Sequence, residues 1–204
     1  MGSSSADVGK VMTPLLRILK QNAATFQLPT DLADSLRVSR DELFTAVDHL
    51  SRLGYAIEFH PYFGFRLVDL PANFLVEEIL ADLNTKLVPK RVLLATSSGS
   101  ALDTAWELAE QGEGDGALVL VDEQIRGRGR LGKGWFSPAG KGLYGALLLR
   151  PADQPEPVSA EFAAYVGIAA AVCLAHTIND IAHIPAVVRW PNDVMIGNKK
   201  AGQV

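Results

Sequence analysis

The sequence has little cysteine: Cys173 is the single one among 204 residues. One cysteine excludes an internal disulfide framework and fits a reducing compartment, which predicts a cytoplasmic protein. Cys173 lies in an apolar run with helical spacing, so we expect a packed thiol rather than a nucleophile. Histidine is also scarce, and the four histidines show no metal-ligand spacing. The sequence therefore predicts no protein-held metal.

Long apolar runs and an excess of one charge are also missing. No run reaches the length of a membrane-spanning helix, and no charged-then-apolar signal peptide opens the chain, so we expect no membrane partner. The formal net charge is −4, which gives no general attraction to nucleic acid. A hydrophobic content of 48% with 21% charged residues is typical of a globular protein of one or two domains.

The first seventy residues predict three helices and a β-hairpin. Apolar spacing predicts a helix over 10–20 with Pro14 in its first turn, and Thr30 is the predicted cap of a helix over 31–36. Ser39 with Glu42 is a capping-box signature for a third helix over 40–53. Strand-like pieces follow at 55–59 and 64–68. This order is typical of a winged helix-turn-helix, which we expect over residues 1–70.

The third predicted helix offers Ser39, Arg40 and Arg52 as candidate DNA contacts. Asp41 and Glu42 on the same helix oppose the attraction to phosphates that dominates DNA affinity. Two interpretations therefore stay open: a module that binds operator DNA, and a module that packs against another partner.

Residues 71–90 predict a linker helix, and residues 91–204 predict an α+β domain with a mixed sheet. Strands are expected at 91–95, 117–121 and 143–150, with a helix over 101–111 between the first two. An alanine-rich helix over 159–178 is expected to be buried against the sheet. Strands around 187–190 and 194–196 follow, with a hairpin turn at 197–198.

A glycine-rich, cationic stretch separates the second and third of these strands. Glycine recurs at positions 127, 129, 132 and 134, with Arg126, Arg128, Arg130 and Lys133 between. Glycine lets the backbone approach a ligand, free N–H groups bind anions, and arginine binds phosphate or carboxylate. The stretch predicts a loop that wraps a phosphate-bearing ligand; a solvated basic turn is the alternative. Its spacing fits neither the Walker loop nor the dinucleotide fingerprint.

Residues 127–135, Gly-Arg-Gly-Arg-Leu-Gly-Lys-Gly-Trp, resemble the Gly-Arg-Gly-Arg-x-Gly-x-x-Trp signature of biotin protein ligases. Residues 189–193 resemble the Lys-Trp-Pro-Asn-Asp motif of that family, and residues 199–202 resemble its Lys-x-x-Gly motif. The resemblance is strong over 90–204 and weak over the first seventy residues. It implies the N-terminal part of a biotin/lipoate ligase-like catalytic domain, with further strands expected beyond Val204. The preceding winged helix is similar to that of ligases that double as repressors.

The resemblance implies a ligase that uses ATP and Mg²⁺ to convert biotin into biotinyl-5′-AMP. The biotinyl group then passes to a lysine of a biotin carboxyl carrier domain of a carboxylase. Repression of a biotin operon through operator DNA, and a homodimer, are further implications. The implied biotin contacts are Ser97, Ser98, Gly99, Gln124, Gly127, Arg128, Gly129, Arg130 and Lys199. The implied contacts to nucleotide and phosphate are Arg128, Arg130, Lys133, Asn192 and Asp193.

Lys199 is the implied catalytic cation, preferred to Lys200 because the family lysine precedes the glycine by three positions. Arg130 is the implied gate for release of the adenylate. Gly99 departs from the family pattern, which has asparagine there, so one amide contact is missing. A lipoate ligase or acyl transferase of the same fold, and a non-enzymatic regulator that senses a small ligand, are the alternative functions.

Overall fold

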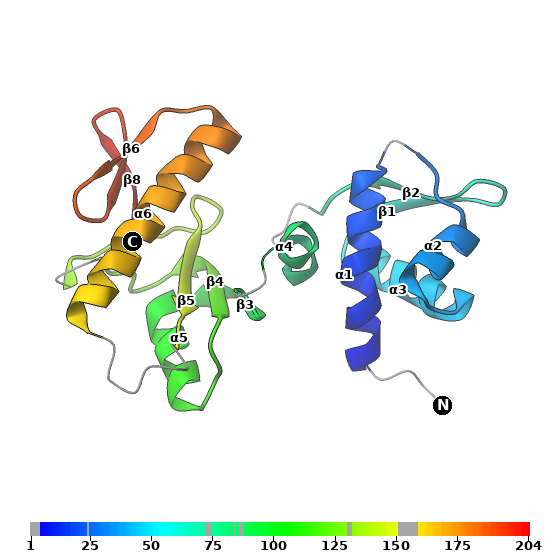
Figure 1. Cartoon of the computed structure of the whole chain (residues 1–204), viewed down its shortest axis with the longest axis horizontal. Coiled ribbons are helices and arrows are strands. Elements are labelled where there is room, and N and C mark those ends of the chain that lie inside the picture. Colours follow the sequence, from blue (N-terminus) through cyan, green and yellow to red (C-terminus); the bar gives the residue numbers. More distant parts are fainter. Residues whose placement is uncertain are drawn as a thin grey trace.

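The computed structural model describes residues 5–23, 25–71, 75–83, 85, 88–129, 132–150 and 159–204. Within these residues the strands form three sheets, and the buried apolar side chains form three separate clusters. Figure 1 shows one set of elements on each side of the short helix α4. The chain is a mixed α+β protein, as expected from the sequence.

The N-terminal elements share one hydrophobic core. They are α1 (Ser5–Gln21), α2 (Pro29–Leu36), α3 (Arg40–Arg52), β1 (Ala56–His60) and β2 (Gly64–Asp69). The strands β1 and β2 pair antiparallel. Leu15, Leu16, Leu43, Leu50 and Tyr55 are buried in the core that the helices and the hairpin enclose. The predicted order of three helices and a hairpin is confirmed.

Two helix starts differ from the prediction. α1 begins at Ser5, so Pro14 lies inside the helix instead of in its first turn. The small and polar residues before position 10 carry no apolar period, which is why the sequence pattern misses the first turns. α2 begins at Pro29 after Leu28 and has no side-chain cap, so Thr30 is not its N-cap. Proline at the first helical position already has the backbone angle that a helix start requires.

The predicted linker helix, α4 (Val76–Asp82), packs against the N-terminal elements. Its Ala81 is buried in their core, and Arg17 of α1 donates a hydrogen bond to the Ala81 carbonyl at 2.7 Å. Lys20 of α1 pairs with Glu78 and, at 2.5 Å, with Asp82. The helix is thus joined to α1 by both apolar and charged contacts.

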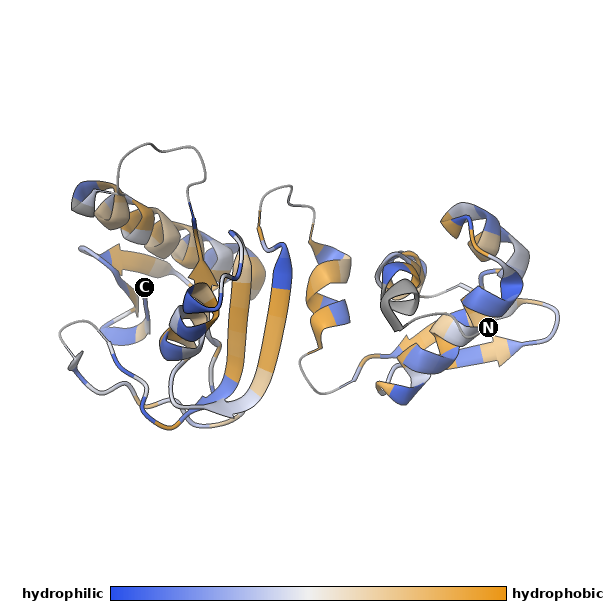
Figure 2. Cartoon of the chain, turned by 90° about the horizontal axis from the view of Figure 1, so that it is seen from below, coloured by the Kyte–Doolittle hydropathy of each residue, from blue (hydrophilic) through white to orange (hydrophobic). Residues whose placement is uncertain are grey.

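The second set of elements begins with a mixed sheet. β3 (Arg91–Ser98) runs parallel to β4 (Ala117–Gln124), with α5 (Ala101–Glu110) connecting them, and β5 (Tyr144–Leu148) pairs antiparallel with β4. Ala101, Ala105, Val119, Val121 and Ala146 form the core between α5 and this sheet. Figure 2 shows these strands as largely apolar. The sheet carries β3 and β4 to a common edge, where the candidate site begins.

A third layer contains α6 (Ala160–Ala182) and the antiparallel sheet of β6 (Ala186–Arg189), β7 (Asp193–Ile196) and β8 (Lys199–Gln203). Ala171 and Ala175 of α6 are buried with Ala186 and Val194. Most other side chains of α6 are exposed, including Cys173. The expectations of a buried helix and a packed thiol are therefore wrong for these residues.

The apolar composition of α6 also bears on the membrane. Among the described residues, Glu161–Ala182 is a helix with the length and composition of a membrane span, and 11% of the 18-residue apolar window within it is buried. The expectation that no apolar run reaches such a length is corrected here. The sequence analysis did not identify this run because histidine and threonine interrupt its apolar residues and because alanine, its commonest residue, is only mildly apolar.

Candidate active site

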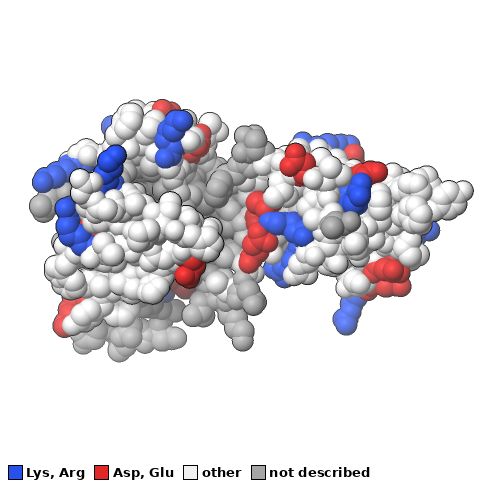
Figure 3. Space-filling model, turned by 90° about the horizontal axis from the view of Figure 1, so that it is seen from above, with Lys and Arg blue, Asp and Glu red and all other residues white. Residues whose placement is uncertain are grey.

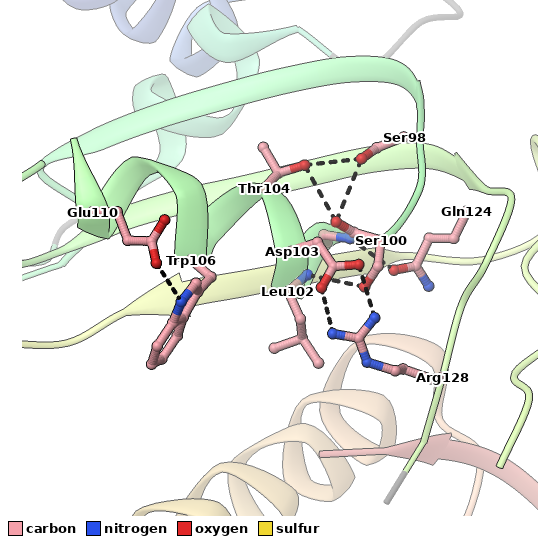
Figure 4. Close-up of polar contacts among 10 residues, drawn as sticks. Ser98, Ser100, Leu102, Asp103, Thr104, Trp106, Glu110, Gln124 and Arg128 are labelled. Atoms are coloured by element: carbon pink, nitrogen blue, oxygen red, sulfur yellow. Dashed lines mark hydrogen bonds and ion pairs between the residues drawn. The ribbon is translucent and has the colours of Figure 1, made fainter. Parts of the chain in front are cut away.

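The turn between β3 and α5 is held by hydroxyl groups. The Ser100 side chain, 1% exposed, accepts a hydrogen bond from the Leu102 N–H at 3.3 Å and caps α5. The Ser98 hydroxyl lies 2.8 Å from that of Thr104 (Figure 4). These contacts satisfy donors at the start of the helix. Of the predicted biotin contacts, Ser98 thus serves the turn in this structure, whereas Ser97 is exposed.

Gln124, at the end of β4, joins the turn to the far end of the glycine-rich loop, residues 125–136. Its Oε1 accepts a hydrogen bond from the Ala101 N–H at 3.0 Å, and its Nε2 donates to the Ser137 hydroxyl at 2.9 Å. The backbone of Gln124 also donates to the Ser137 carbonyl at 3.0 Å. Gln124 therefore fixes the start and the end of the loop relative to α5.

The described parts of the loop form two arms, residues 125–129 (the first arm) and 132–136 (the second arm), which contact each other. Trp135 N–H donates to the Gly127 carbonyl at 2.8 Å, and Gly129 N–H donates to the Lys133 carbonyl at 2.7 Å. A Cβ atom on Gly127 would lie 2.6 Å from the Trp135 carbonyl oxygen, and one on Gly129 would lie 2.8 Å from Oε1 of Gln203. Gly127 is therefore needed for close approach of the two backbones, whereas a Cβ atom on Gly129 would meet only the end of the Gln203 side chain. Arg130 lies outside the described residues.

Arg128 reaches α5 from the first arm of the loop. Its guanidinium contacts both carboxylate oxygens of Asp103, at 2.8 Å and through a second, shorter contact (Figure 4). The hydrogen bond from Arg128 holds the pKa of Asp103 below its ordinary value. Arg126 adds a weaker attraction to the same carboxylate. Gly99 lies in the turn between β3 and α5. A Cβ atom added to Gly99 would lie 3.1 Å from the Arg126 guanidinium.

A cavity of about 420 Å³ lies between the loop and the sheet β6–β8. Its volume is within the range of small-molecule sites. Charged, amide and aromatic groups line it together, which suits an anionic ligand with an apolar part. The lining residues are Gly129, Lys133, Gly134, Trp135, Asn192, Asp193, Lys200 and Gln203.

Lys200 is the best-connected cation of this cavity. Its Nζ lies 2.6 Å from Asp193 Oδ1, 2.7 Å from Gln203 Oε1 and 5.1 Å from the centre of the Trp135 ring. The hydrogen bond from Lys200, followed by one from Arg189, lowers the pKa of Asp193. A lysine held by one carboxylate and one aromatic face keeps its charge directed at the cavity.

Lys199, the neighbour of Lys200, does not line the cavity. Adjacent strand residues point to opposite faces, so the two lysines of β8 separate. A bulge at Ala201 lets Lys200 and Gln203, three positions apart, face the same side. The sequence analysis preferred Lys199 to Lys200 and did not consider Gln203, because strand alternation separates two adjacent lysines without saying which one faces a given side.

The predicted nucleotide contacts are brought together only in part. Lys133, Asn192 and Asp193 line the cavity with Gly129. Asn192 is 8% exposed, and its Nδ2 donates to the Val204 carbonyl at 2.6 Å. Arg128 lies at the root of the loop instead, together with Gln124 and Gly127 of the predicted biotin contacts. Among the described residues, no group of three or more His, Cys, Asp or Glu side chains forms a metal site.

Two of the three candidate DNA contacts, Ser39 and Arg52, are engaged within α3, whereas Arg40 is exposed. The Ser39 hydroxyl and the Glu42 carboxylate form a capping box, with contacts of 2.7 to 3.2 Å. Arg52 pairs with Asp48 at 2.6 Å. Figure 3 shows charges of both signs interspersed on one face of the molecule, without a continuous basic surface on that face.

Comparison with known proteins places the site in a family context. A model of the biotin/lipoate A/B protein ligase family matches residues 96–203, which include the loop and the cavity. The bifunctional ligase/repressor BirA of Bacillus spizizenii is 31% identical over 186 residues, covering 91% of this chain and 56% of that protein. A biotin–[acetyl-CoA-carboxylase] ligase of Paracoccus denitrificans is 41% identical over 90 residues, covering 42% of this chain and 35% of that enzyme.

Among solved structures, a biotin protein ligase from Aquifex aeolicus in complex with biotin and ATP is 29% identical, with a TM-score of 0.44. That match covers 54% of this chain and 44% of the other. The chain thus spans 56% of the length of the ligase/repressor from Bacillus spizizenii. Because the family model matches more than half of the 204 residues, this chain belongs to the biotin/lipoate A/B protein ligase family.

Proposed function

We propose that this chain takes part in activating biotin with ATP to biotinyl-5′-AMP and in transferring biotin to a carrier-protein lysine. One observation carries the proposal: the family match spans a cavity that is lined by Lys133 and Trp135 of the glycine-rich loop and by Lys200 of β8. The relatives named as biotin ligases support biotin as the substrate.

The reaction needs positioning and neutralisation of charge. The biotin carboxylate attacks the α-phosphorus of ATP, pyrophosphate leaves, and a mixed anhydride forms. A lysine amine of the carrier then attacks the carbonyl carbon, and AMP leaves. No protein nucleophile is required, because cations and backbone donors close to the reacting oxygens lower the barrier.

We assign the cation beside the reacting carboxylate and α-phosphate to Lys200 in place of Lys199. Lys200 lines the cavity and is held there by Asp193 and Gln203. Lys133 and the N–H groups of the loop supply further positive charge toward phosphate. Arg130 keeps its proposed role as the gate over the adenylate.

Magnesium accompanies ATP, but the described residues do not fit a protein-held ion. Both carboxylate oxygens of Asp193 are engaged by cations, Oδ1 by Lys200 and Oδ2 by Arg189 at 2.7 Å. A hard cation prefers free carboxylate oxygens and water. We therefore assign no step to magnesium bound by these side chains.

The test is an assay of biotinyl-AMP formation and pyrophosphate release on this chain, with Lys199 and Lys200 as a matched pair. Removing a preorganised cation typically lowers the rate by about 10²–10³-fold. We expect such a loss for Lys200→Ala, whereas Lys199→Ala should stay within about threefold of wild type. The reverse order would return the role to Lys199, and absence of the adenylate from wild type would refute the proposed activity.

Specificity separates biotin from the alternatives. Calorimetry with biotin and with lipoate should give binding of biotin alone, whereas preference for lipoate would indicate a lipoate ligase. Transfer of radiolabelled biotin to a carboxylase carrier domain distinguishes a ligase from a regulator that only senses the ligand.

A second function, operator binding, is favoured by the N-terminal elements. Three helices and a hairpin precede the region that matches the ligase family. The match to the ligase/repressor of Bacillus spizizenii covers 91% of this chain and therefore includes both regions. We propose a winged helix-turn-helix domain over residues 1–70, joined through residues 71–90 to a catalytic domain over 91–204. Gel-shift binding to the gene's upstream region should weaken steeply with salt and with Arg40→Ala. Binding unaffected by both would assign the N-terminal domain to another partner.

A further inference from the structure

We propose that Asp103 is a positioning residue of the site: through Arg128 it holds the first arm of the glycine-rich loop against α5. The inference rests on the proposed function for its meaning in catalysis. The contact itself joins a helix residue outside the loop motif to an arginine within it.

The geometry is that of a two-pronged ion pair. Nη1 and Nη2 of Arg128 each contact a different oxygen of Asp103, which occupies the forked end of the guanidinium (Figure 4). Asp103 lies in the first turn of α5, where a negative charge is favoured by the helix dipole. The hydrogen bond from Arg128 also lowers the pKa of Asp103, so the carboxylate keeps its charge further into the acid range.

The pair completes a series of contacts along the first arm. Ile125 N–H donates to the Ser98 carbonyl at 2.9 Å, and Arg126 N–H donates to the Gly99 carbonyl at 2.8 Å. These bonds tie the start of the loop to the turn before α5. Arg128 lies two residues further on, and its side chain extends the attachment to the helix itself.

The next residue of the arm belongs to the cavity. Gly129 lines it and lies against Gln203, while its N–H bonds to Lys133 of the second arm. The two neighbours therefore contact different parts of the protein: Arg128 contacts α5, and Gly129 lines the cavity. Because Arg128 is held on α5, the positions of Gly129 and of the second arm relative to the cavity are fixed as well.

The strength of the pair decides what it can do. The side chains of Arg128 and Asp103 are 44% and 39% exposed. Exposed ion pairs change populations by only about 1.5- to 5-fold and are weakened by salt. The pair is thus too weak to hold the fold and strong enough to bias the position of a loop.

Trypsin gives a readout that needs no ligand, because the described part of the loop contains cleavage sites after Arg126, Arg128 and Lys133. In Asp103→Asn we expect cleavage in the loop to be about 1.5- to 5-fold faster, with an unchanged melting temperature. Asp103→Glu should restore much of the protection. Glu107→Gln, an exposed carboxylate on the same helix, is the matched control and should cleave at the wild-type rate. Added salt should speed cleavage of wild type and leave Asp103→Asn unchanged.

The functional readout is the KM for biotin in the adenylation assay. Asp103→Asn and Arg128→Gln should each raise KM more than they lower kcat, and the double variant should be no worse than either one, since both act through one contact. Unchanged proteolysis, additive effects, or tighter binding in Asp103→Asn would overturn the proposal; tighter binding would identify Asp103 as a competitor for Arg128. If wild type forms no adenylate, the proposed function fails while proteolysis still tests the ion pair.

Discussion

At the scale of single residues, neighbouring positions of one motif have separate tasks. Lys200 faces the cavity and Lys199 does not, and Arg128 grips α5 while Gly129 lines the cavity. A sequence motif names which residue types gather at a site. The direction of each side chain follows from strand alternation and from one bulge at Ala201, which a single sequence does not disclose.

Gly127 gives the sharpest test at this scale. In Gly127→Ala the new methyl group would meet the Trp135 carbonyl oxygen at 2.6 Å and the Ser137 hydroxyl at 2.7 Å, so the two arms must part. Overpacking of this kind costs about 1–3 kcal/mol, and we expect biotin affinity measured by calorimetry to fall by about 5- to 150-fold. Gly114→Ala, where a Cβ meets nothing within 4 Å, is the control. Equal affinity in both variants would contradict the described path of the loop.

At the scale of elements, α3 shows local chemistry that the sequence does reveal. Ser39 and Glu42 form both bonds of the capping box at the predicted helix start. We expect Ser39→Ala to lower the free energy of unfolding of the N-terminal elements by about 1 kcal/mol, measured by urea denaturation. Ser51→Ala, which removes a hydroxyl bonded to a carbonyl within the same helix, should have little effect. A larger loss for Ser51→Ala would show that the cap is not what secures α3.

The sheet β6–β8 should respond to acid through Asp193. Lys200 and Arg189 lower its pKa in the folded chain, so its stabilising contribution is present above the ordinary value of 3.8 and disappears as pH falls through the lower folded value. We therefore expect wild type and Asp193→Asn to differ in melting temperature at pH 6 and to converge toward pH 2. A difference that grows on acidification would show that Asp193 is not held ionised by its two partners.

What the sequence predicted at this scale depended on how local the cause was. The three N-terminal helices, the hairpin and the strands β3 and β4 were found because apolar period, caps and turns are written in adjacent residues. The first turns of α1 lack an apolar period and were missed. The burial of α6 was misjudged because alanine content describes a helix without saying what lies against it.

At the scale of the whole molecule, the described residues leave several apolar side chains exposed along and beside α6. Ile181 is 78% exposed and Trp190 is 73% exposed. Apolar patches of this kind bind hydrophobic dyes and promote association. We expect native protein to enhance the fluorescence of anilinonaphthalene sulfonate, and Ile181→Gln to reduce that signal. Leu28→Gln, an exposed leucine on the N-terminal elements, is the matched control; equal reductions would argue against a patch centred on α6.

The docking of α4 on α1 has a further consequence for motion within the chain. Ala81 is sealed in the N-terminal core, and Tyr55 donates a hydrogen bond to Glu78 at 3.0 Å beside the Lys20 pairs. A helix attached in this way travels with the elements before it. Fluorophores placed on α1 and α4 should therefore report one fixed separation, whatever the position of the elements that follow Asp82.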